Sequence, residues 1–196
     1  MSTRRGRRAR SLTSAAAALA VAAAAVGLAL HWDLLELAPA QDADEPAEAT
    51  SATVAYVIDG DTIAANLPGD SGDPQRIRLL GINTPEVSRG DSPGECGAED
   101  ATAQLEELLP EGAPIRLASD SRADDADRYE RLLRYVELED GTDAGHALIE
   151  KGLAVAWAPA GEPTPERLPD YEDATSTARE AQTGLWATCP RMPTTR

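Results

Sequence analysis

The stretch from Val57 to Glu86 constrains the fold of this chain more than any other. It reads Val-Ile-Asp-Gly-Asp-Thr-Ile, then a polar loop, then Arg-Ile-Arg-Leu-Leu-Gly-Ile-Asn-Thr-Pro-Glu. A glycine between two aspartates, flanked by β-branched residues, predicts two strands joined by a tight turn in which Gly60 takes a positive φ. The second run predicts a strand that ends in a polar turn, where Pro85 fixes φ just before Glu86.

The polar residues of this stretch predict a functional site. A hairpin of this kind gathers oxygen ligands, one guanidinium and one further carboxylate at its ends: Asp59, Asp61, Arg78, Asn83, Thr84 and Glu86. Hard cations such as calcium bind clusters of carboxylate, amide and backbone oxygens. A guanidinium beside such a cluster stabilises the charge that develops in phosphoryl chemistry. The structural alternatives are that Asp59 and Asp61 only shape the turn, that Arg78 is a solvated strand residue, and that Glu86 caps the turn.

The net negative charge of the chain excludes a broadly basic surface that would bind any nucleic acid. The net charge is −16, from 18 basic and 34 acidic residues, and from residue 41 onward 13 basic and 32 acidic residues give −19. Such a domain repels nucleic acid at long range, so any nucleic-acid role depends on a local site. Because aromatic residues are only 4% and Phe is absent, Leu, Ile, Val and Ala must build the core.

The first 40 residues have the layout of an export signal or a membrane anchor. Arginines between residues 4 and 10 precede an apolar run of 19 residues, at 12–30. This run is longer than a usual signal-peptide core and close to the length of a membrane span. A small-residue cleavage pattern at Ala38-Pro39-Ala40 leaves open whether residues 1–40 are removed. Either reading places the rest of the chain outside the cytoplasm, secreted or attached to the membrane through residues 12–30; an Ala-rich cytosolic helix is the alternative.

The two cysteines, Cys96 and Cys189, fit an exported protein. An even number of cysteines in an oxidising compartment predicts one disulfide, here closing a loop of about 94 residues. Two separate thiols are the alternative. His31 and His146 are the only histidines and lie far apart in the sequence, which argues against a zinc site.

The order of apolar patterns predicts an α+β fold with a mainly β core. Residues 41–50 form an acidic linker, residues 51–189 the folded domain, and residues 190–196 a tail. Five strands are expected at 53–57, 62–67, 76–82, 115–118 and 132–138, with a short apolar strand at 153–157. Helices are expected at 98–109, at 144–151 with Asp143 as its cap, and at 170–183. Five short strands with three helices suggest a small barrel, for which the OB-fold is a candidate.

Three motifs in order resemble those of the staphylococcal (micrococcal) nuclease, or thermonuclease-like, family. They are the Val-Ile-Asp-Gly-Asp-Thr stretch, the Arg-Leu-Leu-Gly-Ile-Asn-Thr-Pro-Glu run, and Asp-Arg-Tyr-Glu-Arg at 127–131. The resemblance covers roughly residues 51–187. It implies a five-stranded OB-fold barrel with three helices, and calcium-dependent hydrolysis of phosphodiester bonds in DNA and RNA.

The resemblance also implies roles for individual residues. Asp61, Asn83 and the backbone carbonyl of Thr84 would hold the calcium ion. Glu86 would act as the general base, while Arg78 and Arg131 would grip the phosphate. The substrate would also be contacted by Arg128, Tyr129 and Trp157, although Trp157 fits a core position as well.

Two positions depart from the family pattern. Asn83 stands where the family usually has Asp, so one negative charge is missing from the expected calcium site. Glu130 stands where the family often has Gly, and either Glu130 or Asp127 could pair with Arg131. The sequence thus favours an exported, monomeric calcium-dependent nuclease with no protein partner. A non-catalytic OB-type module that kept the fold is the alternative.

Overall fold

Five strands that pair edge to edge form the centre of the fold. The computed structural model describes residues 49–70 and 72–192, so the predicted signal or anchor segment, residues 1–40, lies outside the described residues. Within the described ranges, no helix combines the length and the apolar character that a membrane span requires. The described part begins inside the acidic segment 41–50, with a strand that starts at Ala49.

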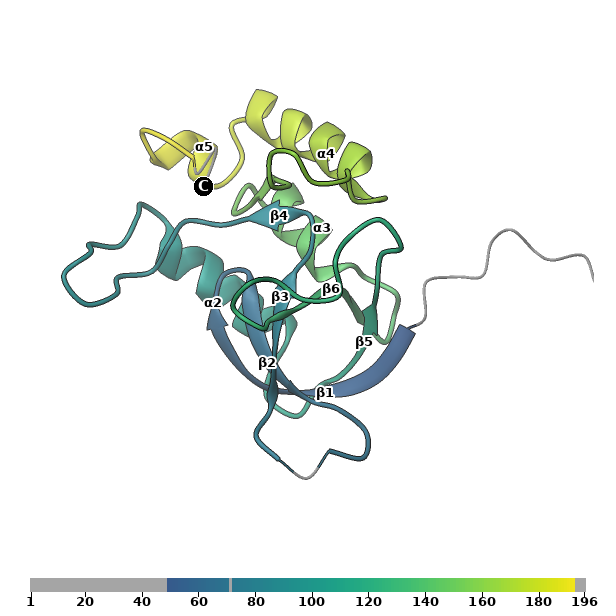
Figure 1. Cartoon of the computed structure of the whole chain (residues 1–196). Coiled ribbons are helices and arrows are strands. Elements are labelled where there is room, and N and C mark those ends of the chain that lie inside the picture. The colour runs from purple at the N-terminus through teal and green to yellow at the C-terminus, as the bar shows by residue number, and fades with distance from the viewer. Residues whose placement is uncertain (1–48, 71, 193–196) are drawn as a thin grey trace, which may run out of the picture. The chain divides into compact units, whose positions relative to one another are not determined.

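The five strands close a barrel in the order β1, β2, β3, β6, β5 (Figure 1). Their bounds are β1 Ala49–Asp59, β2 Thr62–Asn66, β3 Gln75–Leu79, β5 Pro114–Ala118 and β6 Leu132–Leu138. β3 and β6 pair in parallel, and the other neighbours pair antiparallel. Ser51 of β1 pairs with Arg116 of β5, which closes the sheet on itself. The predicted five-stranded barrel with an α+β fold is confirmed.

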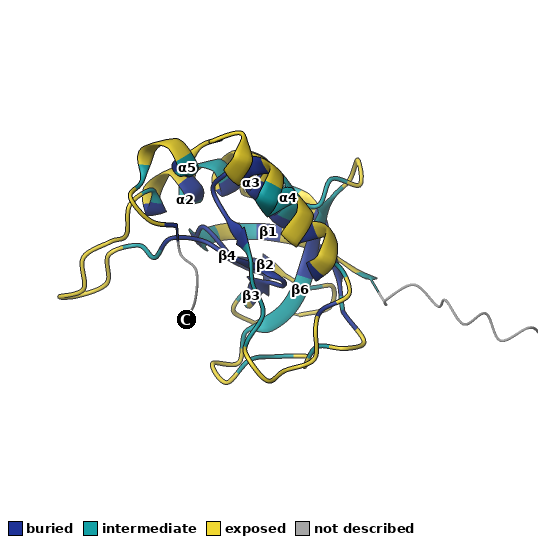
Figure 2. Cartoon of the chain, turned by 90° about the horizontal axis from the view of Figure 1, so that it is seen from above, coloured by how far each residue is buried: buried dark blue, intermediate teal, exposed yellow. Residues whose placement is uncertain are grey.

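Side chains alternate between the barrel interior and its surface, as strand geometry requires. In β1, Ala52 and Val54 are buried while Thr53 between them is exposed. Figure 2 shows most of β2 and the middle of β6 coloured as buried. The core continues under the helices and includes Met192, near the end of the described chain.

Three helices follow the expected pattern, and a fourth short helix is added. They are α2 Ala98–Leu108, α3 Ala144–Glu150, α4 Leu168–Glu180 and α5 Leu185–Thr188. Asp143 caps α3 as expected, since its side chain accepts a hydrogen bond from His146 N at 3.0 Å. α4 begins two residues before the expected start, because Pro169 fits the first turn of a helix, where its missing N–H is not needed. α3 packs between α4 and β6 (Figure 1).

The third strand is shorter than the sequence suggests. The apolar run predicted one strand at 76–82, but β3 ends at Leu79 and a turn at Leu80 and Gly81 follows. Gly81 has φ of +81°, and a Cβ there would approach the ring of Tyr171 to 3.0 Å. The chain then forms β4, Ile82–Asn83, which leaves the barrel and pairs with β7, Val155–Ala156. This break turns the residues after Ile82 away from the barrel wall.

Position 60 requires glycine because a side chain would not fit there, and not because the backbone has a positive φ. The expectation of a positive φ at this turn was wrong, because Gly60 is not among the positive-φ residues of the described chain. A Cβ on Gly60 would lie 2.7 Å from Thr84 Oγ1 and 2.9 Å from Ala101 Cβ. The absence of a side chain therefore lets the β1–β2 turn approach the segment after β4.

A buried carboxylate joins the barrel to α4. Asp120 Oδ2 accepts hydrogen bonds from Tyr135 Oη at 2.5 Å and from Glu166 N at 2.6 Å. Burial tends to raise the pKa of Asp120, but the hydrogen bonds from Tyr135 and from the backbone of Glu166 and Arg122 outweigh it and lower the pKa. Burial and the same carboxylate raise the pKa of Tyr135. The ionised form of Asp120 is therefore the one that the fold stabilises.

We expect Asp120→Asn to destabilise the protein at pH 7 by about 1–3 kcal/mol, the cost of weakening buried hydrogen bonds to a charged group. Because the pKa of Asp120 is lowered from 3.8 on folding, its contribution is present above that pH and is lost as the pH falls through the folded-state value. Thermal unfolding at pH 7 and near pH 3 should show a smaller difference between variant and parent at the lower pH. Asp124→Asn, an exposed position in the same loop, is the control; an equal difference at both pH values would contradict the assignment.

The two cysteines form the expected disulfide. Cys96, just before α2, is bonded to Cys189, just after α5, across 93 residues of chain. The bond ties the loop after β4 to the last helix of the domain. This confirms the pairing predicted from the even number of cysteines.

Loss of the disulfide should destabilise the fold by up to about 4 kcal/mol, because a long loop in the unfolded chain is no longer closed. Chemical unfolding with and without reductant measures the effect, and intact-mass analysis shows whether the bond is present. The double variant Cys96→Ser/Cys189→Ser should be insensitive to reductant. A midpoint that reductant leaves unchanged in the parent would show that the bond does not stabilise the domain.

Candidate active site

The core of the site lies where the β1–β2 turn meets the end of β3. Thr62 of β2 pairs with Arg78 of β3, which places the preceding Asp61 beside the arginine. Asp61 Oδ2 lies 3.1 Å from Arg78 Nη2, and both side chains are buried. Asp61 Oδ2 also accepts a hydrogen bond from Thr84 N at 3.2 Å. The structure thus joins the two halves of the stretch from Val57 to Glu86 through one ion pair.

Backbone carbonyls complete the surroundings of the buried Arg78. Its Nη1 donates to Leu79 O at 2.7 Å and its Nη2 to Ile82 O at 2.9 Å. Nη2 also lies 3.5 Å from Asn83 Oδ1. A buried charge is tolerated when it is both paired and hydrogen-bonded, and Arg78 meets both conditions. The break between β3 and β4 supplies these carbonyls, so the short third strand is part of the site.

A second buried carboxylate, Asp59, lies next to the first. Its Oδ1 accepts a hydrogen bond from Asp61 N at 3.2 Å, and its Oδ2 forms an ion pair with Arg89. Burial, followed by the negative charge of Asp61, raises the pKa of Asp59. Asp59 is therefore more than a turn residue, since it brings a second carboxylate to the site. Arg89 was not expected there, because it lies in a polar loop without any sequence motif.

Glu86 lies at the start of this loop, two residues after Thr84. It is half-buried, and its backbone N–H donates to Glu95 Oε2 at 2.9 Å. Glu95 N in turn donates to Glu86 O at 2.8 Å. These two bonds fix the backbone of Glu86 immediately beside the residues that contact Asp61.

Arg131 reaches the same site from the residue just before β6, the strand that pairs with β3. Its Nη1 donates to Thr62 Oγ1 at 3.2 Å, and Thr62 Oγ1 donates to Asp61 Oδ1 at 3.1 Å. One threonine hydroxyl therefore links Arg131 to Asp61. Thr62 was not expected to contribute, although its position next to Asp61 was the available signal.

Asp127 holds Arg131 in place. Its Oδ2 accepts from Arg131 Nε at 2.8 Å and lies 2.7 Å from Nη2, a two-bond contact that fixes the guanidinium plane. Burial tends to raise the pKa of Asp127, but hydrogen bonds from the backbone and side chain of Arg131 outweigh it and lower the pKa. Of the two carboxylates that the sequence offered as partners of Arg131, Asp127 makes the ion pair. Glu130 has φ of +62°, a left-handed conformation that explains why glycine suits this position.

An exposed tyrosine surrounded by arginines extends the site. Tyr129 is 54% exposed, and Arg128 Cζ lies 4.8 Å from its ring centroid. Arg131 Cζ lies 5.7 Å from the same centroid, and Arg76 Nη2 donates to Tyr129 O at 2.7 Å. This cluster is a local basic patch on an otherwise acidic domain. Trp157 is half-buried, and its backbone N–H donates to Gly81 O at 2.8 Å, just before the start of β4.

The site contains oxygen donors of the kind that hard cations accept, of which Asp61 Oδ2 and Asn83 Oδ1 both face Arg78 Nη2. Asp61 and Asn83 offer side-chain oxygens and Thr84 a backbone carbonyl, all in buried residues. Asn83 Nδ2 is buried and has no hydrogen-bond partner among the described residues, which is costly unless a further group binds there. Among those residues, no three His, Cys, Asp or Glu side chains cluster as metal ligands. Calcium accepts this mixture of oxygen donors.

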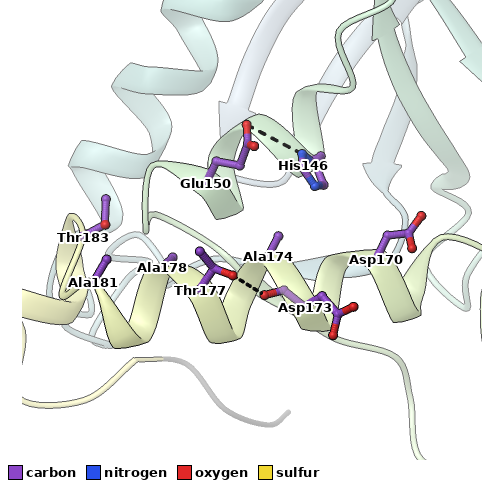
Figure 3. Close-up of a pocket in the computed structure, with 9 residues that line it drawn as sticks. All are labelled: His146, Glu150, Asp170, Asp173, Ala174, Thr177, Ala178, Ala181 and Thr183. Carbon is purple, nitrogen blue, oxygen red and sulfur yellow. Dashed lines mark hydrogen bonds and ion pairs between the residues drawn. The ribbon is translucent and has the colours of Figure 1, made fainter.

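A separate pocket of about 460 Å³ lies between α3 and α4 (Figure 3). Figure 3 shows Ala174 and Thr177 of α4 facing His146 and Glu150 of α3, which form a pair with Nδ1 and Oε2 3.7 Å apart. The lining is mostly small and acidic and contains none of the expected site residues. Its carboxylates make it unsuitable for a phosphate group, so the candidate site is the one at the β1–β2 turn.

The chain is thus a five-stranded barrel that carries buried carboxylates and two arginines around the β1–β2 turn. The family model described as Staphylococcal nuclease homologue matches residues 76–188 of this chain. The chain belongs to that family, and the resemblance indicated by the three motifs is confirmed.

Relatives in the same comparisons carry nuclease names. The chain is 30% identical over 141 residues to the SPbeta prophage-derived endonuclease YokF of Bacillus subtilis (strain 168), covering 71% of this chain and 45% of that protein. It is 31% identical over 136 residues to Endonuclease YncB of the same organism, covering 69% of this chain and 61% of the relative. The chain is 34% identical over 104 residues to the Thermonuclease of Staphylococcus hyicus, covering 53% of this chain and 57% of that protein. The matched region thus spans only about half to three-fifths of the length of these proteins.

Proposed function

We propose that this protein is an exported nuclease that hydrolyses phosphodiester bonds of DNA or RNA with the help of calcium. The observation that carries the proposal is the buried Arg78–Asp61 pair, joined through Thr62 to Arg131. This arrangement places two guanidinium groups around one carboxylate. Membership of the nuclease family and the names of the relatives support the same activity.

The two arginines are suited to bind the phosphate and stabilise its transition state. Negative charge grows on the phosphate oxygens during hydrolysis, and positioned guanidinium groups lower the barrier by binding that charge. Arg78 is held by backbone carbonyls and Arg131 by Asp127, so both guanidinium groups have fixed positions in the site before substrate binds. When bound by Asp61, Asn83 and Thr84, calcium would supply further positive charge at the reacting phosphate.

Glu86 is the proposed general base. A water molecule must lose a proton to attack phosphorus, and a carboxylate within hydrogen-bonding reach can accept it. Glu86 follows the Asn83–Thr84 segment after one residue, Pro85, and its backbone is fixed by Glu95. The residue is half-buried, and its Oε1 atom is shielded from solvent.

The basic cluster around Tyr129 is the proposed substrate platform. An exposed aromatic ring can stack on a base, and Arg128 is positioned to contact a phosphate. Trp157 is a second candidate for base contact. Only a few arginines contribute to substrate binding. This agrees with a domain whose net charge is negative and which must therefore recognise nucleic acid at a local site.

Export is part of the proposal. The disulfide between Cys96 and Cys189 suits an oxidising compartment, and the relatives include a thermonuclease. The apolar run at 12–30 would direct the chain outward, as a secreted protein or one anchored in the membrane. We propose that the protein acts as a monomer without a protein partner.

The test is degradation of supercoiled plasmid DNA and of single-stranded RNA by the purified protein, in calcium and in the calcium chelator EGTA. We expect cleavage in calcium and none in chelator. Glu86→Gln should lower kcat by about two to four orders of magnitude, the usual contribution of a general base, with little change in substrate affinity. Glu111→Gln, an exposed position after α2, is the matched control.

Cleavage by Glu86→Gln within a few-fold of the parent rate would remove Glu86 as the base. An intact parent protein that binds an oligonucleotide but cleaves neither substrate would instead support the non-catalytic module.

The calcium ligand set can be tested through Asn83. We expect Asn83→Asp to lower the calcium concentration for half-maximal activity several-fold, because it adds a negative charge to a set with one carboxylate. Calorimetric titration with calcium, in the absence of substrate, measures the same change directly. Asn66→Asp adds an equal charge at an exposed position of β2 and should not alter calcium binding. An unchanged or weaker calcium affinity in Asn83→Asp would reject the ligand assignment.

A further inference from the structure

The segment of residues 86–97, here called the site loop, is bonded to itself. Its base is closed by two hydrogen bonds, one from Glu86 N to the side-chain Oε2 of Glu95 and one from Glu95 N to Glu86 O. Its tip is closed by Arg89 and Ser92, whose backbones exchange hydrogen bonds of 3.1 Å in both directions. Ser88 Oγ adds a bond to Ser92 O at 3.2 Å. These internal bonds give the loop a defined conformation, so that any movement would involve the loop as one unit.

Almost nothing in the site loop is buried. Every residue from Ser88 to Cys96 is exposed, so the hydrophobic effect does not hold the loop against the barrel. The position of the loop must come from specific contacts at its two ends and its tip.

One contact is covalent and lies at the far end of the loop. Cys96 is bonded to Cys189, and the next residue, Gly97, packs against α5. A Cβ on Gly97 would come within 2.3 Å of Leu185 Cδ2, so this approach requires glycine. The far end of the loop is thus held by the carboxyl-terminal helix.

The other contact is the ion pair between Arg89 at the tip and Asp59 in the β1–β2 turn. The Asp59 side chain is 6% exposed, whereas that of Arg89 is 58% exposed. The arginine therefore reaches from an exposed loop to a carboxylate that is buried beside Asp61. This pair is the direct link between the loop that begins with Glu86 and the turn that carries Asp61.

We propose that Arg89 is a positioning residue, which docks the disulfide-tethered site loop on Asp59 and so fixes Glu86 relative to the Arg78–Asp61 pair. The inference rests on the proposed nuclease function. With the loop held at Cys96 and at Arg89, Glu86 has one position in the site. Without Arg89, the loop is held only at its disulfide end, and its start at Glu86 shifts relative to the Arg78–Asp61 pair, a kind of misplacement that can cost up to about a hundredfold in rate.

The experiment compares four variants with the parent, all with the disulfide intact: Arg89→Gln, Arg89→Lys, Asp59→Asn, and the double variant Asp59→Asn/Arg89→Gln. Arg89→Gln should lower kcat about ten- to a hundredfold and change KM less than about twofold. Arg89→Lys should recover most of the rate, because an ammonium group can still pair with Asp59. Arg116→Gln is the matched control, since Arg116 is 60% exposed and belongs to β5, and its removal should leave both constants unchanged.

The double variant separates positioning from a direct effect of charge. If Arg89 and Asp59 act through one contact, the double variant should be no slower than the slower single variant. Recovery of the parent rate in the double variant would overturn the proposal, because the harm would then come from the unpaired carboxylate. A raised KM with unchanged kcat in Arg89→Gln would also overturn it, since Arg89 would then bind substrate directly.

Hydrogen exchange gives a readout that does not depend on activity. The amides of Glu86 and Glu95 should exchange faster in Arg89→Gln than in the parent, while amides of the barrel strands stay unchanged. Equal exchange in both proteins would show that Arg89 does not dock the loop. If the parent itself cleaves no nucleic acid, the proposed function fails, and the exchange comparison still decides whether Arg89 docks the loop.

Discussion

The ion pair between Arg78 and Asp61 is the interaction on which the rest of the site depends. A buried guanidinium is costly unless its charge is matched and its donors are satisfied. Asp61 matches the charge, while the carbonyls of Leu79 and Ile82 satisfy donors. Those carbonyls face Arg78 because the strand breaks at Gly81 and the chain turns away into β4. The break between β3 and β4 therefore supplies hydrogen-bond acceptors that the buried Arg78–Asp61 pair requires.

Two further elements are organised around this pair by carboxylates. Asp127 holds Arg131, which reaches Asp61 through the hydroxyl of Thr62. Asp59 holds Arg89, which brings the loop after Glu86 against the β1–β2 turn. In both cases a carboxylate fixes an arginine that comes from a distant part of the chain. This pattern explains how a strongly acidic domain can present a few positive groups at one place, with the disulfide between Cys96 and Cys189 limiting the movement of the loop.

Much of the barrel and of the site was predictable because local signals pointed to them. Glycine and aspartate mark the turn between β1 and β2, alternation marks the strands, and Asp143 marks the start of α3. The motifs also placed Asp61, Arg78, Asn83 and Thr84 close together, and the structure brings these residues into contact. The even number of cysteines was enough to predict the bond between Cys96 and Cys189 in the described domain.

The sequence alone indicated the strands, the turns and most residues proposed for the chemistry, because hydrophobic periodicity and turn residues are local properties of the chain. Only the tertiary structure decided which partner each charge takes. Arg131 pairs with Asp127 and not with Glu130, since the left-handed backbone at Glu130 belongs to a turn that closes on Asp127. Gly60 is required because Thr84 and Ala101 approach it from residues far along the chain. Arg89 joins the site only because folding brings an exposed loop to a buried carboxylate 30 residues earlier, a contact that has no signature in the sequence.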